Sequence, residues 1–198
     1  DAVIALGNIF GYADGMSYGV VSASNYKATF FDGECAVIAT DIPAEEQGTG
    51  MLFNMDGEVV GMISSSVWND TGKNVVNAYG ISDLKPIIEL LINGKSVPYI
   101  GIYGTTVTEQ LAEEHKMPSG IYVADVDPDS PAMAAGIQIG DIICEASGEE
   151  IKDIAAYQNI VIGSSVGETM EFVGKRLGLD GYVNIKFSVV TTEKEEVK

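Results

Sequence analysis

Four short glycine-containing motifs in the second half of the chain constrain its fold most strongly. Each apolar run within them predicts a β-strand, and Asp129-Ser130-Pro131 predicts the start of a short helix that Gly136 ends. A lone apolar-glycine-apolar run is typical of many strands, so the prediction depends on the order and spacing of the whole set. The motifs are, in order, Tyr99-Ile100-Gly101-Ile102, Gly120-Ile121-Tyr122-Val123, Asp129-Ser130-Pro131-Ala132 with Ala135-Gly136-Ile137, and Gly140-Asp141-Ile142-Ile143.

In this order and spacing the motifs resemble those of a bacterial PDZ domain. They are similar in particular to the PDZ module of the HtrA/DegP family, in which a trypsin-like protease domain precedes one or two PDZ domains. The resemblance implies that a peptide adds as an extra strand between the strand from Ile100 and a later helix, while backbone N–H groups hold its terminal carboxylate. It assigns peptide binding to Tyr99, Ile100, Gly101, Ile102, Tyr157 and Ile160.

Three of these six residues have a second interpretation. The resemblance implies that Ile102, Tyr157 and Ile160 line the pocket for the last side chain of the ligand. Apolar residues at such positions of a strand or helix also serve as ordinary core residues, so core packing is the alternative for each of them.

The first half of the chain reads as β-structure. Residues 1 to about 80 contain many short β-prone segments, separated by turns such as Asp32-Gly33 and Asp56-Gly57. This pattern, with no helical period between the segments, predicts a barrel or a sandwich. The period then changes, and the apolar residues of Ser82 to Ile92 predict a helix that Asn93-Gly94 ends.

The same half also carries a resemblance to HtrA proteases. Ala5-Leu6-Gly7-Asn8-Ile9-Phe10-Gly11 resembles their Ala-Ile-Gly-Asn-Pro-Phe-Gly segment, and Asp56-Gly57-Glu58-Val59-Val60-Gly61 matches the chain around their nucleophile. The resemblance implies that residues 1–95 are the C-terminal barrel of a trypsin-like protease domain and that residues 98–192 are the PDZ domain. The expected fold class is therefore mainly β with some α, a trypsin-like β-barrel lobe followed by a PDZ domain.

The resemblance weakens at the catalytic loop. Counting back from Asp56-Gly57-Glu58, the Gly-Asn-Ser-Gly-Gly of the family corresponds to Glu46 through Gly50, which puts Gly48 where the serine belongs. Glycine has no side-chain oxygen, so it cannot form an acyl-enzyme. We therefore interpret Gln47, Gly48, Thr49 and Gly50 as a degenerate loop without a catalytic residue, and Thr49 as nucleophile is the alternative.

A general base is also missing from these residues. By resemblance, the histidine and aspartate of the family belong to a first barrel that the sequence does not include. The one histidine, His115, falls on a charged helix of the second half, and we interpret it as a solvated surface residue.

Composition excludes several classes of partner. With 29 acidic and 11 basic residues the formal charge is −18, which repels nucleic acid and anionic membranes. We expect no membrane span or signal peptide in these residues, and we expect the chain to be a piece of something longer. Cys35 and Cys144 lie in separate apolar contexts typical of buried thiols, and no metal or cofactor motif is present in the sequence.

The sequence therefore predicts an HtrA-like protein, proteolytically inactive in this form, that binds extended or C-terminal peptides or unfolded protein segments through its PDZ domain. The resemblance implies protein quality control outside the cytoplasm, with membrane anchoring and homo-oligomer formation through absent N-terminal segments. The alternative is an active serine-type endopeptidase whose missing barrel supplies His and Asp and whose nucleophile is Thr49 or a residue that the motif does not reveal.

Overall fold

The computed structural model describes residues 1–11, 13–45, 48–67 and 74–193. The chain forms two compact units. The first contains Asp1–Ala28 and Cys35–Ile88, and the second contains Thr29–Glu34 and Glu89–Lys198. The short segment Thr29–Glu34 thus belongs to the second unit although it lies early in the sequence. We propose residues 1–95 as the protease barrel and residues 98–192 as the PDZ domain.

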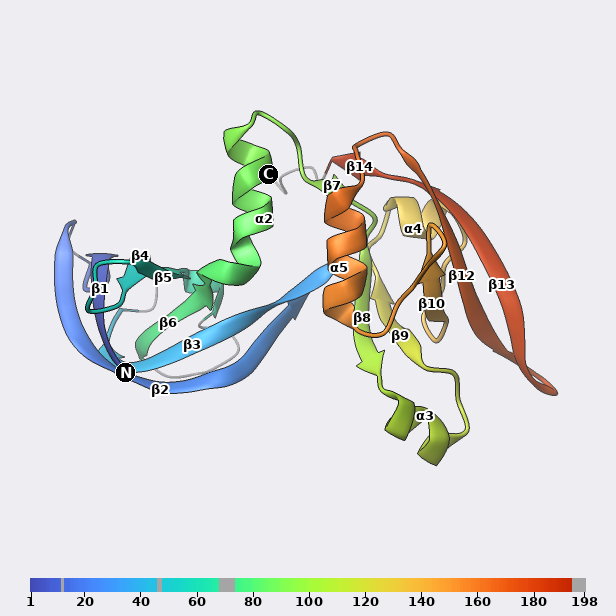
Figure 1. Ribbon diagram of the computed structural model, residues 1–198, viewed down its shortest axis with the longest axis horizontal. Helices are drawn as coiled ribbons and strands as arrows, with labels where there is room; N and C mark the ends of the chain where they lie inside the picture. Colours follow the sequence, from blue (N-terminus) through green and yellow to red (C-terminus); the bar gives the residue numbers. More distant parts are fainter. Residues whose placement is uncertain (12, 46–47, 68–73, 194–198) are drawn as a thin grey trace. The chain divides into compact units, whose positions relative to one another are not determined.

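The first unit is a closed β-barrel, which confirms the barrel predicted from the sequence. Its strands follow each other around the barrel in the order β1-β2-β3-β6-β5-β4, and β1 pairs with β4 to close it (Figure 1). A short 3-10 helix, η1 (Ser65–Val67), and the helix α2 (Ile81–Ile92) complete the unit. The strands are β1 (Ala2–Asn8), β2 (Gly15–Phe30), β3 (Gly33–Pro43), β4 (Thr49–Phe53), β5 (Val59–Ile63) and β6 (Val75–Gly80). The end of β2 and the start of β3 fall in the segment Thr29–Glu34, which belongs to the second unit.

Two glycines allow the barrel to close. Gly7 of β1 and Gly50 of β4 are partners in the register of this pair. A Cβ atom at Gly50 would lie 2.1 Å from the carbonyl oxygen of Leu6, and one at Gly7 would lie 2.3 Å from that of Thr49. Because no side chain fits at these distances, the close approach of β1 and β4 requires glycine at both positions. The barrel interior is filled by Val3, Ala5, Ile9, Ile42, Leu52, Ile63, Val76 and Ala78.

The second unit is built on one antiparallel sheet. Its strand order is β13-β12-β10-β9-β8, so β8 is an edge strand, and β11 (Glu149–Glu150) pairs with β10. A separate pair joins β7 (Pro98–Tyr99) to β14 (Thr192–Glu193). The sheet strands are β8 (Ile102–Val107), β9 (Gly120–Val126), β10 (Ile142–Ala146), β12 (Thr169–Gly178) and β13 (Gly181–Val190).

Three short helices complete the second unit, and each starts at a capping side chain. Thr108 caps α3 (Glu109–His115), Ser130 caps α4 (Pro131–Ala134) and Asp153 caps α5 (Ile154–Gly163). In each case the side-chain oxygen accepts a hydrogen bond from an N–H group of the first turn, which would otherwise lack a partner. Within the described part of the chain, no helix is both long and apolar enough to cross a membrane.

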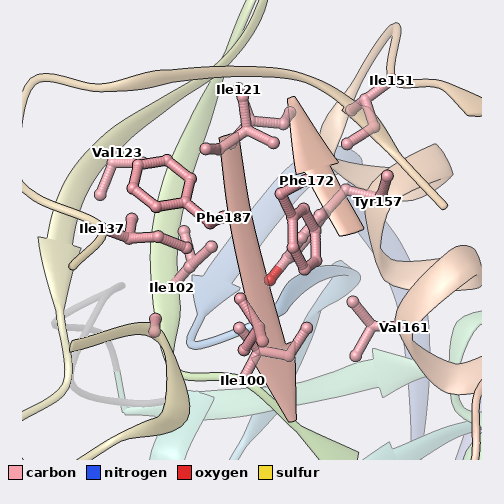
Figure 2. Packing of buried hydrophobic residues seen from close by; sticks show 14 of the residues in the cluster. Ile100, Ile102, Ile121, Val123, Ile137, Ile151, Tyr157, Val161, Phe172 and Phe187 are labelled. Atoms are coloured by element: carbon pink, nitrogen blue, oxygen red, sulfur yellow. The ribbon is translucent and has the colours of Figure 1, made fainter. Parts of the chain in front are cut away.

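A single apolar core holds the sheet and α5 together. Figure 2 shows Ile100, Ile102, Tyr157 and Phe172 among the side chains of this core. The rings of Tyr157 and Phe172 lie 6.4 Å apart, which joins α5 to β12. Because these residues are fully buried, the core fixes the position of α5 relative to the sheet.

The core predicts the effect of a truncation. We expect Phe172→Ala to lower the free energy of unfolding by about 3–5 kcal/mol, because it removes a fully buried ring and leaves a cavity. Urea unfolding followed by circular dichroism measures the change. Leu179→Ala is the matched control, because Leu179 is fully exposed between β12 and β13. Equal stability of the two variants would contradict this account of the core.

Candidate peptide-binding site

The turn that joins β7 to β8 has an unusual backbone orientation. The carbonyl oxygen of Ile100 accepts a hydrogen bond from the N–H of Ala132, and that of Gly101 accepts one from the N–H of Asp127, both at 2.9 Å. In a trans peptide unit the N–H points opposite to the carbonyl. The N–H groups of Gly101 and Ile102 therefore point away from the segment that binds the carbonyls.

Gly101 is required for this orientation. Its φ of +94° lies in the left-handed region that favours glycine. A Cβ atom here would also lie 2.4 Å from the Cβ atom of Ser130, the N-cap of α4. A side chain at this position would displace the turn from α4, so the motif glycine has a physical reason.

Three consecutive N–H groups of this turn converge on one carboxylate, that of Asp32. The N–H groups of Ile100 and Gly101 donate to Oδ2, each at 2.7 Å, and the N–H of Ile102 donates to Oδ1 at 3.0 Å. The hydroxyl of Tyr157 on α5 also donates to Oδ1, at 2.6 Å. Asp32 lies in the segment Thr29–Glu34 of the same unit and is only 8% exposed. The turn is thus a formed carboxylate site.

Neighbouring residues of the segment continue this contact along β8 and α5. The N–H of Asp32 donates to the carbonyl oxygen of Ile102 at 2.7 Å, in the manner of an added strand. The ring of Phe31 meets that of Tyr103 edge-on at 5.8 Å. On the other side, the Oε1 atom of Gln158 on α5 accepts a hydrogen bond from the N–H of Glu34. The segment therefore contacts both the edge strand and the helix.

Burial sets the electrostatics of the site. It raises the pKa of the Asp32 carboxyl above its usual range, although the hydrogen bonds from Tyr157 and the three N–H groups oppose the shift. The pKa of Tyr157 is raised by burial and by the charge of Asp32, so its hydroxyl keeps its proton and donates. Tyr99 donates to the carboxylate of Asp127, and its pKa is raised by burial and by that carboxylate.

The six predicted peptide-binding residues fall into distinct environments. Ile100, Gly101 and Ile102 supply the N–H groups, and Tyr157 supplies its hydroxyl. The side chains of Ile102 and Tyr157 are fully buried, whereas Ile160 is half-buried against the same core. Ile160 also lines a surface pocket of about 430 Å³, which lies beside β11 and β12 and includes no residue of β8. Their part in peptide binding stays a prediction.

Sequence reasoning missed the residues that fill the site. The sequence marks Asp32-Gly33 only as a turn and gives no signal for Phe31 or Gln158. The Asp-Gly pair marks a turn between two strands but carries no local signal of what the turn contacts.

The structure places only part of the degenerate catalytic loop. Gln47 lies outside the described residues. Gly48 is buried, and a Cβ atom there would lie 3.3 Å from the carbonyl oxygen of Glu45 and 3.5 Å from the Cα atom of Ile9. Thr49 is exposed, and Thr49 and Gly50 pair with β1 as part of β4.

The backbone at Gly48 bears on oxyanion stabilisation. Its N–H donates to the carbonyl oxygen of Glu45 at 3.0 Å, so in this structure the donor is engaged within the loop. An oxyanion site needs N–H groups that point at the reacting atom. The lone histidine, His115, is exposed at the end of α3 in the second unit.

Comparison with known proteins accounts for both units. The PDZ domain profile matches residues 122–176. Over 183 residues the chain is 31% identical to the probable periplasmic serine endoprotease DegP-like of Halomonas elongata. The alignment covers 89% of this chain and 38% of that protein. This chain is homologous to the DegP-like serine endoproteases. The periplasmic serine endoprotease DegP of Escherichia coli is 28% identical over 94% of this chain and 40% of its own.

Solved structures agree with the fold of this DegP-like chain. The HtrA-type protease AlgW with tripeptide matches with a TM-score of 0.62 and 22% identity, over 100% of this chain and 66% of that one. The serine endoprotease from Yersinia pestis matches with a TM-score of 0.57 and 24% identity. This match covers 98% of this chain and 62% of that one. The chain spans about two fifths of the length of the curated relatives named above.

The Asp32–Tyr157 hydrogen bond yields a prediction. We expect Tyr157→Phe to raise the pKa of the Asp32 carboxyl further, because it removes a donor that favours the charged form. Titration of the carboxyl carbon of Asp32 by NMR measures the change. The phenylalanine ring keeps the packing against Phe172, so an unchanged or lower pKa would contradict the assignment of Tyr157 as a donor.

Proposed function

We propose that this DegP-like chain binds peptides through their free C-terminal carboxylate, in the groove between β8 and α5 of its PDZ domain. The observation that carries the proposal is the convergence of the Ile100, Gly101 and Ile102 N–H groups on a carboxylate. The neighbouring edge of β8 offers backbone groups for the rest of the peptide. Extended peptides and unfolded protein segments would then be the partners.

The geometry of the turn fixes what kind of group it accepts. The site presents N–H and O–H donors, so it suits an anion with two oxygens and disfavours an amide, whose NH₂ group would face donors. Ile102 and Tyr157 are packed in the core, which leaves Ile160 as the predicted pocket residue with partial exposure. An apolar last residue of the ligand is the expectation that follows.

Peptide binding is tested with a matched pair of ligands. We expect decapeptides that end in Val or Leu to bind the chain in the micromolar range, and their C-terminal amides to bind much more weakly. Two-dimensional NMR detects binding as shifts of the Ile100, Gly101 and Ile102 amide signals. Equal binding of acid and amide, or shifts confined to other regions, would refute the carboxylate site.

We also propose that the protease lobe is proteolytically inactive in this form. Gly48 in place of the serine supports the proposal, and so does the engaged N–H of Gly48. Glu45 and Glu46 precede the proposed nucleophile position in the sequence, and their negative charge disfavours an oxyanion close to them. The relatives are named serine endoproteases, so an active enzyme with Thr49 or another nucleophile is the competing function.

Cleavage of an unfolded protein separates these two functions. We expect no cleavage of reduced casein by the longest natural form that contains this chain, nor by its Thr49→Ala variant, because the nucleophile position lacks an oxygen. Gel electrophoresis over several hours measures the outcome. Cleavage that disappears in Thr49→Ala would establish Thr49 as the nucleophile, and cleavage that persists would point to a residue outside the degenerate loop.

The names of the relatives support a compartment. Because the matched DegP-like proteins are called periplasmic, we propose that this chain acts outside the cytoplasm in protein quality control. Anchoring to a membrane and assembly into a homo-oligomer are parts of the same proposal.

A further inference from the structure

We propose that the segment Thr29–Glu34 is a built-in occupant of the peptide groove, and that a peptide binds only after this segment has left. The inference rests on the proposed peptide binding and adds its regulation. Asp32 supplies the carboxylate that a ligand would otherwise bring. The groove then has a closed state, with Asp32 bound, and an open state that accepts a peptide.

The contacts of Asp32 combine two features of a bound peptide end. Its carboxylate takes the three N–H groups of the turn, and its own N–H pairs with the carbonyl oxygen of Ile102 on the edge strand. A peptide that adds to β8 needs both interactions at once. The side-chain carboxylate of Asp32 stands in for a terminal carboxylate.

Occupation by Asp32 excludes a second carboxylate. Each backbone N–H has one hydrogen to donate, and Asp32 already engages the three donors at 2.7–3.0 Å. A second negative charge within a few ångströms would also repel the first. Because Asp32 is only 8% exposed, little room remains for a ligand beside it. Binding of a peptide at this turn therefore requires displacement of Asp32.

The closed state contains features that favour release. Asp32 adopts φ of +64°, a left-handed conformation that costs a residue other than glycine some free energy, though aspartate tolerates it better than most. Burial of its carboxylate is unfavourable and is offset only by the donors that a ligand would use as well. Gly33 lies against Gln158 so closely that a Cβ atom there would be 2.5 Å from its Cδ atom. The close packing of Gly33 favours the closed state, whereas the left-handed φ of Asp32 and the burial of its carboxylate oppose it.

Self-occupation lowers the apparent affinity by a simple rule. The apparent Kd equals the intrinsic Kd divided by the fraction of molecules that are open. If about 1–10% of molecules are open, removal of Asp32 tightens peptide binding by about 10- to 100-fold. The increase in affinity is limited to ligands with a free carboxylate, since only these accept hydrogen bonds from the freed N–H groups.

The test compares Asp32→Ala with Asp56→Ala in the full chain of 198 residues. Asp56 is a matched control because it also precedes glycine in a turn between two strands, and it is exposed. The first measurement is amide hydrogen exchange at Ile100, Gly101 and Ile102. We expect exchange at least about tenfold faster in Asp32→Ala than in wild type, and unchanged exchange in Asp56→Ala.

The second measurement is fluorescence anisotropy with a labelled decapeptide pool that ends in Val or Leu, as free acid and as amide. We expect Asp32→Ala to bind the acid about tenfold or more tightly than wild type or Asp56→Ala, with no gain for the amide. Equal acid binding by wild type and Asp32→Ala would overturn self-occupation and leave the proposed peptide binding intact. Faster exchange without binding of any peptide would overturn the proposed function, and with it the regulation.

A second variant opens the groove without touching the carboxylate. Gly33→Ala places a methyl group against Gln158 and leaves every donor and Asp32 in place. We expect it to accelerate exchange at Ile100–Ile102 and to tighten acid binding, as Asp32→Ala does. This variant decides the question if Asp32→Ala fails to fold. Faster exchange of the Glu34 amide, which donates to Gln158, reports that the methyl group has displaced the segment. Wild-type exchange at Ile100–Ile102 and wild-type affinity in such a folded protein would overturn the proposal.

Discussion

The carboxylate of Asp32 and the three N–H groups that it binds determine how the turn before β8 is organised. A buried carboxylate without partners is unfavourable by several kcal/mol, so such a group persists in a protein only when donors surround it. Here the hydrogen bonds to the carboxylate are charge-assisted. Their N–H donors are also held in place, because the carbonyl oxygens of Ile100 and Gly101 accept hydrogen bonds from Ala132 and Asp127. The turn and the carboxylate therefore stabilise each other.

Because the turn binds any carboxylate through the same N–H groups, one carboxylate can replace another with little change in these hydrogen bonds. A peptide terminus and the Asp32 side chain present the same two oxygens to the same N–H groups, so these bonds largely cancel in the balance between closed and open states. What remains is the difference between the other contacts. On the side of the segment these include the Phe31–Tyr103 ring contact and the Glu34–Gln158 hydrogen bond. A ligand must replace them with its own side chains.

Sequence patterns predicted the two lobes and much of the turn, because those features follow from local chemistry. Gly101 is glycine for a steric reason that its motif reflects, and Asp153 is a cap that its position before an apolar helix reveals. Asp32 could not be predicted in this way. Asp32-Gly33 and Asp56-Gly57 are the same dipeptide between two strands, yet Asp32 is left-handed and buried, whereas in the second pair Gly57 is left-handed and Asp56 is exposed. Only the tertiary fold distinguishes them, since Ile100–Ile102 lie far away in the sequence.

The same distinction between local and tertiary requirements applies to the catalytic loop. The proposed loss of the serine concerns one side chain and can be predicted from a motif, whereas an oxyanion site depends on the direction of backbone N–H groups. At Gly48 the N–H is bound to Glu45, and a Cβ atom would press against that same carbonyl. The side chain at this position and the direction of its N–H are thus separate requirements, and the proposed inactivity draws on both. The carboxylate site before β8 shows the opposite case, because its N–H groups stay aligned whichever carboxylate they bind.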